Sequence, residues 1–96
     1  MVNEEKLIVI KEYLSTKFSG CQVENKLEFD TKAMAFKVHA PQGPLLLKVG
    51  YEFSEDNSKQ EILRLFDQWD LAEILRKETE LWVFVTGEGI ETFHRG

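Results

Sequence analysis

The pattern of apolar and polar positions predicts a helix followed by a three-stranded meander. Residues 4–19 carry apolar side chains at helical spacing, with Asn3 as the N-cap and Gly20 just past the end. Residues 21–29 alternate almost strictly, which predicts a half-buried strand. Polar residues 30–32 turn the chain into a second strand, and a Pro–Gly–Pro turn leads into a third. The expected core-facing residues of these two strands are Met34, Phe36, Val38, Ala40, Leu45, Leu47, Val49, Tyr51 and Phe53.

Two capping-box spacings mark helix starts in the second half of the chain. The first is Ser58–Glu61 and the second is Asp70–Glu73, where we expect Asp70 to cap a helix. The apolar face changes phase at this point, so the pattern predicts either two short helices or one helix kinked near Asp70. Residues 81–86 are largely apolar on both faces, which predicts a central strand, and residues 90–95 return as a last strand. Val83 or Phe84 should be fully buried.

This order, α-β-β-β-α-(α)-β-β, predicts one α+β domain over residues 1–96. We expect a five-stranded, mainly antiparallel sheet with helices packed on one face. The opposite face must then carry apolar residues that the chain itself does not cover, unless the N-terminal helix covers that face alone. Exposed apolar patches mark interfaces, and a second copy is the commonest partner, so we expect a homodimer. The candidate interface residues are Leu46, Trp82, Phe84 and Phe93.

Charge and composition narrow the classes of function. The 17 acidic residues outnumber the 12 basic ones and give a net charge of −5, which argues against a nucleic-acid-binding surface. No apolar run approaches the length of a membrane span, and the first residues do not resemble a signal peptide. Cys21 is the only cysteine, so no intrachain disulfide can form. These features indicate a soluble, cytoplasmic protein with no membrane partner.

The sequence contains no recognisable catalytic or ligand-binding motif. A zinc site needs several converging Cys, His or acidic ligands, whereas Cys21, His39 and His94 have no paired spacing. We expect Cys21 to be a buried thiol and both histidines to lie on the surface. The serines stand near helix ends or in turns, and no glycine-rich loop leads into a helix. The sequence therefore favours a non-enzymatic domain without metal or cofactor.

One resemblance is to the metal-dependent nucleases with the PD-(D/E)xK pattern, whose core has the order α-β-β-β-α-β. In that family an Asp opens the second core strand and an acid-x-Lys lies on the third. Here Asp30 precedes the second strand and Lys48 lies on the third, but Leu46 occupies the place of the acid. Glu24-Asn25-Lys26 spells the motif on the first strand instead. The resemblance implies a degenerate nuclease-like or nucleic-acid-binding domain as the alternative function.

The element order also resembles the type III secretion chaperones, which are small acidic proteins. That resemblance covers most of the chain and rests on topology, with no shared motif. It implies a protein that dimerises and binds an unfolded segment of a partner protein. Because fold analogy alone does not carry function, the leading hypothesis is stated more generally: a small protein-interaction domain that self-associates through its sheet and binds a protein partner.

Overall fold

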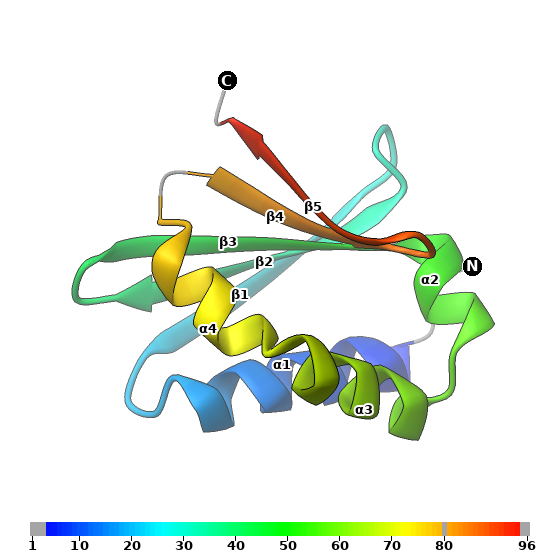
Figure 1. Ribbon diagram of the computed structural model, residues 1–96, viewed down its shortest axis with the longest axis horizontal. Coiled ribbons are helices and arrows are strands. Elements are labelled where there is room, and N and C mark those ends of the chain that lie inside the picture. Colours follow the sequence, from blue (N-terminus) through cyan, green and yellow to red (C-terminus); the bar gives the residue numbers. More distant parts are fainter. Residues whose placement is uncertain (1–3, 80, 95–96) are drawn as a thin grey trace.

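Five strands form one mixed sheet whose spatial order follows the chain, β1-β2-β3-β4-β5 (Figure 1). The computed structural model describes residues 4–79 and 81–94. β1, β2 and β3 are an antiparallel meander, β4 runs parallel to β3, and β5 returns antiparallel to β4. The predicted α+β class is confirmed. The elements are α1 (Glu4–Lys17), β1 (Gln22–Glu28), β2 (Ala33–Ala40), β3 (Gly43–Gly50), α2 (Tyr51–Asp56), α3 (Lys59–Trp69), α4 (Leu71–Lys77), β4 (Leu81–Thr86) and β5 (Gly89–His94).

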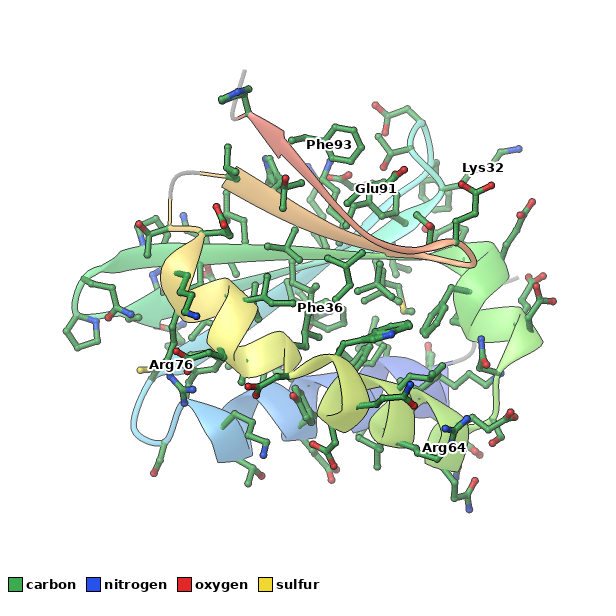
Figure 2. The ribbon with its side chains drawn as sticks, in the orientation of Figure 1. Lys32, Phe36, Arg64, Arg76, Glu91 and Phe93 are labelled. Atoms are coloured by element: carbon green, nitrogen blue, oxygen red, sulfur yellow. The ribbon has the colours of Figure 1, made fainter. Side chains whose placement is uncertain are left out.

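The helices lie against one face of the sheet, as the sequence predicts (Figure 1). Parallel strands need a crossover connection, and α2, α3 and α4 supply it between β3 and β4. The strand register places the alternating apolar residues of β2 and β3 opposite one another on the helical side. Figure 2 shows Phe36 pointing from the sheet toward the helices. The core between the two layers includes Ile10, Leu14, Met34, Phe36, Leu45, Leu47, Ile62, Phe66, Leu71 and Leu75, each exposed by no more than 1%.

The third strand is shorter than the alternation predicts. β3 ends at Gly50, and Tyr51 begins the short helix α2, so the assignment of Tyr51 and Phe53 to the strand is wrong. Phe53 still reaches the core, because α2 turns it toward the helical layer, where its ring lies 6.4 Å from that of Phe66. Asn57 donates a hydrogen bond to the Phe53 carbonyl and closes the end of α2.

The two predicted capping boxes have different outcomes. The Ser58 box is confirmed: the Glu61 N–H donates to Ser58 Oγ at 3.1 Å, and the Ser58 N–H donates to Glu61 Oε1 at 3.0 Å. The role of Asp70 is wrong, because its side chain makes no capping hydrogen bond. Two helices do form, but Asp70 joins them in the left-handed conformation, with φ 55° and ψ 49°. Its backbone N–H bonds back to the carbonyls of Asp67 and Phe66 and ends α3.

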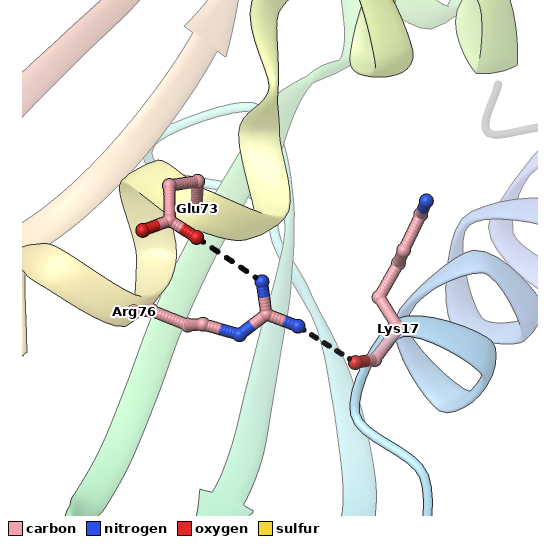
Figure 3. A network of polar contacts seen from close by, with 3 residues as sticks. All are labelled: Lys17, Glu73 and Arg76. Atoms are coloured by element: carbon pink, nitrogen blue, oxygen red, sulfur yellow. Dashed lines mark hydrogen bonds and ion pairs between the residues drawn. The ribbon is translucent and has the colours of Figure 1, made fainter.

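Arg76 on α4 ties the second helical segment to the end of α1 (Figure 3). Its guanidinium donates to the Lys17 carbonyl at 3.0 Å and lies 3.4 Å from the Glu73 carboxylate. It also stacks 4.9 Å from the centre of the Phe18 ring. The interaction satisfies a carbonyl that the last turn of α1 leaves without a helical partner. α1 ends at Lys17, two residues before the predicted end, and Gly20 turns the chain with φ 83° after it; the predicted Asn3 cap lies outside the described residues.

The strand predicted over residues 81–86 lies inside the sheet, between β3 and β5. Val83 and Val85 face the helices and are completely buried. Trp82 and Phe84 point to the other side and are only half-buried. The expectation of a buried Val83 is therefore confirmed, but the helices cover one side of β4 and leave the other open.

Candidate interaction surface

The open face of the sheet is the side that turns away from the helices. The strand register aligns Leu46, Trp82 and Phe93 across β3, β4 and β5. The next row, in the same direction, contains Lys48, Phe84 and Glu91. The four residues predicted from the sequence to form an interface therefore lie together on one face. We call Leu46, Trp82, Phe84 and Phe93 the aromatic strip.

Exposure differs along the aromatic strip. Leu46 is 9% exposed, Trp82 and Phe84 are half-buried, and Phe93 is 47% exposed. Phe84 and Phe93 contact each other edge to face, with ring centres 5.9 Å apart. Figure 2 shows Phe93 on the side of β5 away from the helices. Exposure along the strip therefore increases from Leu46 on β3 to Phe93 on the last strand.

The other half of the open face, on β1 and β2, is polar. Glu24, Lys26, Lys37 and His39 are all exposed there. His39 Nε2 lies 2.7 Å from Glu24 Oε2. This hydrogen bond holds the pKa of the Glu24 carboxyl below its ordinary value. The polar half can face water without a partner. Only the apolar residues on β3, β4 and β5 would gain from being buried by another molecule.

Lys48 connects the two halves of the open face. Its ammonium is 2.8 Å from Glu28 Oε1 on β1, a contact that passes over β2, where the register places Ala33 and Ala35. The same ammonium lies 4.6 Å from the centre of the Trp82 ring, a cation–π distance. Small side chains on β2 leave room for this arrangement.

The carboxylate of Glu28 is held by two donors. Thr31 Oγ1 donates to it at 2.7 Å, in addition to the Lys48 ammonium. The hydrogen bonds from Lys48 and then Thr31 lower the pKa of Glu28, and partial desolvation opposes them. The side chains of Lys48 and Glu28 keep only 16% and 18% of their surface exposed. A shallow groove of about 500 Å³ lies beside this pair, with Ala35, Leu46 and Trp82 among its lining residues.

A second apolar surface was not predicted from the sequence. Ile8 on α1 is 50% exposed, and Leu27 and Phe29 at the end of β1 are 38% and 78% exposed. They line a concave groove of about 640 Å³ together with Leu7 and Tyr51. We call this surface the α1–β1 groove. The Tyr51 hydroxyl is buried and has no hydrogen-bond partner among the described residues.

One sequence signal could have pointed to the α1–β1 groove. The alternation over residues 21–29 puts Leu27 and Phe29 on one face, but β1 ends at Glu28, and the pattern could not show that α1 leaves both side chains uncovered. The apolar face of α1 contains Leu7 and Ile10, whereas Ile8 falls outside it. A single apolar residue off the buried stripe is ordinary, but Ile8 together with Leu27 and Phe29 forms a contiguous exposed apolar surface.

The structure does not assemble a metal or catalytic site from the candidate residues. His39 and His94 are exposed, as expected, and Cys21 is half-buried rather than fully buried. Asp30, the nuclease candidate, is exposed in the β1–β2 turn, and Lys48 is engaged by Glu28. Over residues 4–79 and 81–94, no group of three or more His, Cys, Asp or Glu residues is placed to hold a metal ion. No helix within the same ranges is long and apolar enough to span a membrane.

Comparisons with known proteins assign no family. No protein-family model, curated protein or solved structure matches the chain. Its functional interpretation therefore depends on the surfaces described above.

Proposed function

We propose that this chain is a non-enzymatic protein-interaction domain that self-associates as a homodimer through its sheet. The observation that carries the proposal is the aromatic strip on the open face. Leu46, Trp82, Phe84 and Phe93 lie on three adjacent strands, and the helices cover only the opposite side. Contiguous apolar residues beside a polar surround are typical of an interface.

Shape decides between the two apolar surfaces. The α1–β1 groove is concave, so two copies of it facing each other would enclose a void instead of packing. The aromatic strip is a row on a sheet, and Phe93 protrudes at its end. A twofold dimer needs a patch that is complementary to itself. The strip extends to Phe93 on the last strand, where a second copy could join it, whereas the groove fits a convex partner protein.

The strip also has the residues that dominate binding energy. Trp and other aromatic side chains are enriched among the residues that carry most of an interface's affinity. Full burial of a Phe side chain is worth about 1.5–3 kcal/mol, and Phe93 has half of its surface still to bury. The proposal places the protein in the cytoplasm, because a single cysteine in a small domain suits a reducing compartment.

Sedimentation equilibrium over a range of micromolar concentrations tests the proposal. The wild-type mass should rise with concentration toward twice the monomer's 11.2 kDa. Phe93→Lys should lower the association constant at least tenfold. Phe29→Lys is the matched control, because it makes the same chemical change at a more exposed Phe outside the strip.

Each outcome has a defined meaning. A wild-type mass that stays near 11.2 kDa at every concentration refutes self-association. An equal loss of association in both variants would mean that added charge, and not loss of the strip, causes the effect. Loss in Phe29→Lys alone would transfer the interface to the α1–β1 groove.

A further inference from the structure

β5 is the least protected strand of the sheet. It is last in the strand order, so within the described residues one side of its backbone has no strand partner. Thr92 and His94 face the helical side, yet both are exposed, as are Glu91 and Phe93 on the open face. Figure 1 shows β5 beyond β4, away from α1 and α3. Among residues 4–79 and 81–94, neither a helix nor a strand covers this edge.

The two edges of the sheet differ in their charge. β1 has Glu24, Lys26 and Glu28 at alternate positions, and charged side chains are a common protection of an edge strand against pairing. β5 contains no Lys or Pro, and Glu91 is its only acidic residue. Its pairing with β4 is continuous from Gly89 to His94, without a bulge that would twist the edge away. β5 is therefore the edge that can accept another strand.

We propose that β5 pairs antiparallel with β5 of a second copy, about a twofold axis at Thr92, and joins the two sheets into one. The proposal rests on the proposed self-association and specifies its geometry. The pairing keeps both helical layers on one side and both open faces on the other. It replaces the hydrogen bonds that the free backbone edge makes to water with hydrogen bonds between two strands.

The side-chain pattern selects the register. Residues that are directly opposite each other must point to the same face, so the axis passes through a residue and not between two residues. A register centred on Glu91 would oppose two carboxylates, which is destabilising. A register centred on Phe93 would pair only residues 92–94 of the described strand. The register centred on Thr92 pairs residues 90–94 and opposes no like charges.

This register would also fuse the two aromatic strips. Phe93 would face Glu91 of the partner subunit, and the two copies of Phe93 would become diagonal neighbours about 7–8 Å apart, within reach of aromatic side chains. The row from Trp82 to Phe93 would then continue through Glu91 of the partner subunit to the partner's Phe84, and the two Phe93 rings would meet diagonally across the axis. Because only residues 90–94 of each copy pair, the interface is small, and the dimer should dissociate reversibly at micromolar concentration.

Disulfide crosslinking measures the register directly. In a Cys21→Ser background, Thr92→Cys places two thiols opposite each other at the axis, where antiparallel partners have Cα atoms about 4.5–5.5 Å apart. That spacing suits a disulfide. His94→Cys is the matched control on the same strand and face, because its two copies would be about 14 Å apart along the strand direction. Asn25→Cys is the control for the β1 edge.

In a glutathione redox buffer, Thr92→Cys should form a covalent dimer at least tenfold faster than either control. If the Cys21→Ser chain dimerises by sedimentation but Thr92→Cys crosslinks no faster than His94→Cys, the edge pairing is refuted and self-association stands. If the Cys21→Ser chain is monomeric at every concentration, the proposed function fails, and the edge pairing fails with it.

Hydrogen exchange of the wild-type protein keeps the proposal testable if Thr92→Cys does not fold. Amides of residues 89–94 should exchange more slowly as the concentration rises through the association range, while those of β1 should not change. Concentration-dependent protection that omits β5 would refute the pairing.

Discussion

Lys48 offers a direct test of the open face, because one ammonium contacts both the polar and the apolar half. We expect Lys48→Met to destabilise the fold while keeping a side chain of similar length over β2. An exposed ion pair contributes about 0–1 kcal/mol, whereas removing one partner of a buried pair costs about 3–5 kcal/mol. Lys48 and Glu28 retain 16% and 18% exposure, which places them between these cases.

The expected cost is about 2 kcal/mol, because Thr31 continues to donate to Glu28 in the variant. For a domain of 96 residues this corresponds to a melting temperature lowered by roughly 10 °C. Urea unfolding at pH 7 measures the free energy. A double-mutant cycle with Glu28→Gln should give a coupling energy of about 1–2 kcal/mol. Lys37→Met, at an exposed lysine of the same face, is the control and should cost less than about 0.5 kcal/mol.

The pH dependence has a definite sign. The pKa of Glu28 is lowered in the folded state, so the ion pair contributes fully above the ordinary value of 4.5. Its contribution is lost as the pH falls through the folded pKa. The stability difference between wild type and Lys48→Met should therefore shrink in acid. A cost below about 0.5 kcal/mol at pH 7, or a cost that remains constant down to pH 3, would refute this account of the pair.

Three further predictions concern the helices and the α1–β1 groove. The backbone of Asp70 is left-handed, so Asp70→Ser should lower the free energy of unfolding by about 1 kcal/mol, whereas Asp70→Gly should leave it unchanged or raise it. A side-chain N-cap would instead accept Ser without loss, and urea unfolding distinguishes the two cases. Ser58→Ala should cost about 1 kcal/mol in the same assay, because the Glu61 N–H loses its acceptor; no measurable cost would contradict the observed cap. Phe29→Gln and Ile8→Gln should reduce binding of a hydrophobic dye while unfolding free energies stay within about 0.5 kcal/mol; unchanged dye binding would show that the groove is not the exposed apolar site.

The sequence predicted the sheet well because its alternation is long. Met34 to Ala40 and Leu45 to Val49 each follow a two-residue period on either side of the turn, and the observed register pairs these inner residues with one another. The prediction was wrong at the end of the third strand, where the alternating pattern is short. Tyr51 and Phe53 extend the alternation by only two more positions, and in the structure they lie in α2, where Phe53 contacts Phe66.

Asp70 shows a different limit of sequence patterns. A capping box requires an extended N-cap residue, so the preceding helix must end at least one residue earlier. Here α3 continues to Trp69 and α4 begins at Leu71, so Asp70 alone makes the bend. Its left-handed backbone redirects the chain between helices. The spacing from Asp70 to Glu73 is the same for a capping box and for a left-handed bend. Only the point at which α3 ends distinguishes the two.

The candidate interface follows a similar logic. Alternation assigns Leu46, Trp82, Phe84 and Phe93 to a face, but their exposure depends on neighbours that are distant in sequence. Lys48 extends over Trp82 because Ala33 and Ala35 leave space on the adjacent strand, while Phe93 has no strand beyond it.

The two ends of the open face therefore differ in how well they are protected against pairing with another strand. Near β1, the acidic residues Glu24 and Glu28 are paired with His39 and Lys48, and these charges keep that half polar and discourage strand addition. No comparable pair lies on β5 within the described residues, where Phe93 remains exposed. An apolar residue and a free backbone edge thus coincide at one end of the sheet. In the proposed pairing a second copy of β5 addresses both features, because its backbone pairs with the free edge and its own Phe93 lies diagonally beside the first.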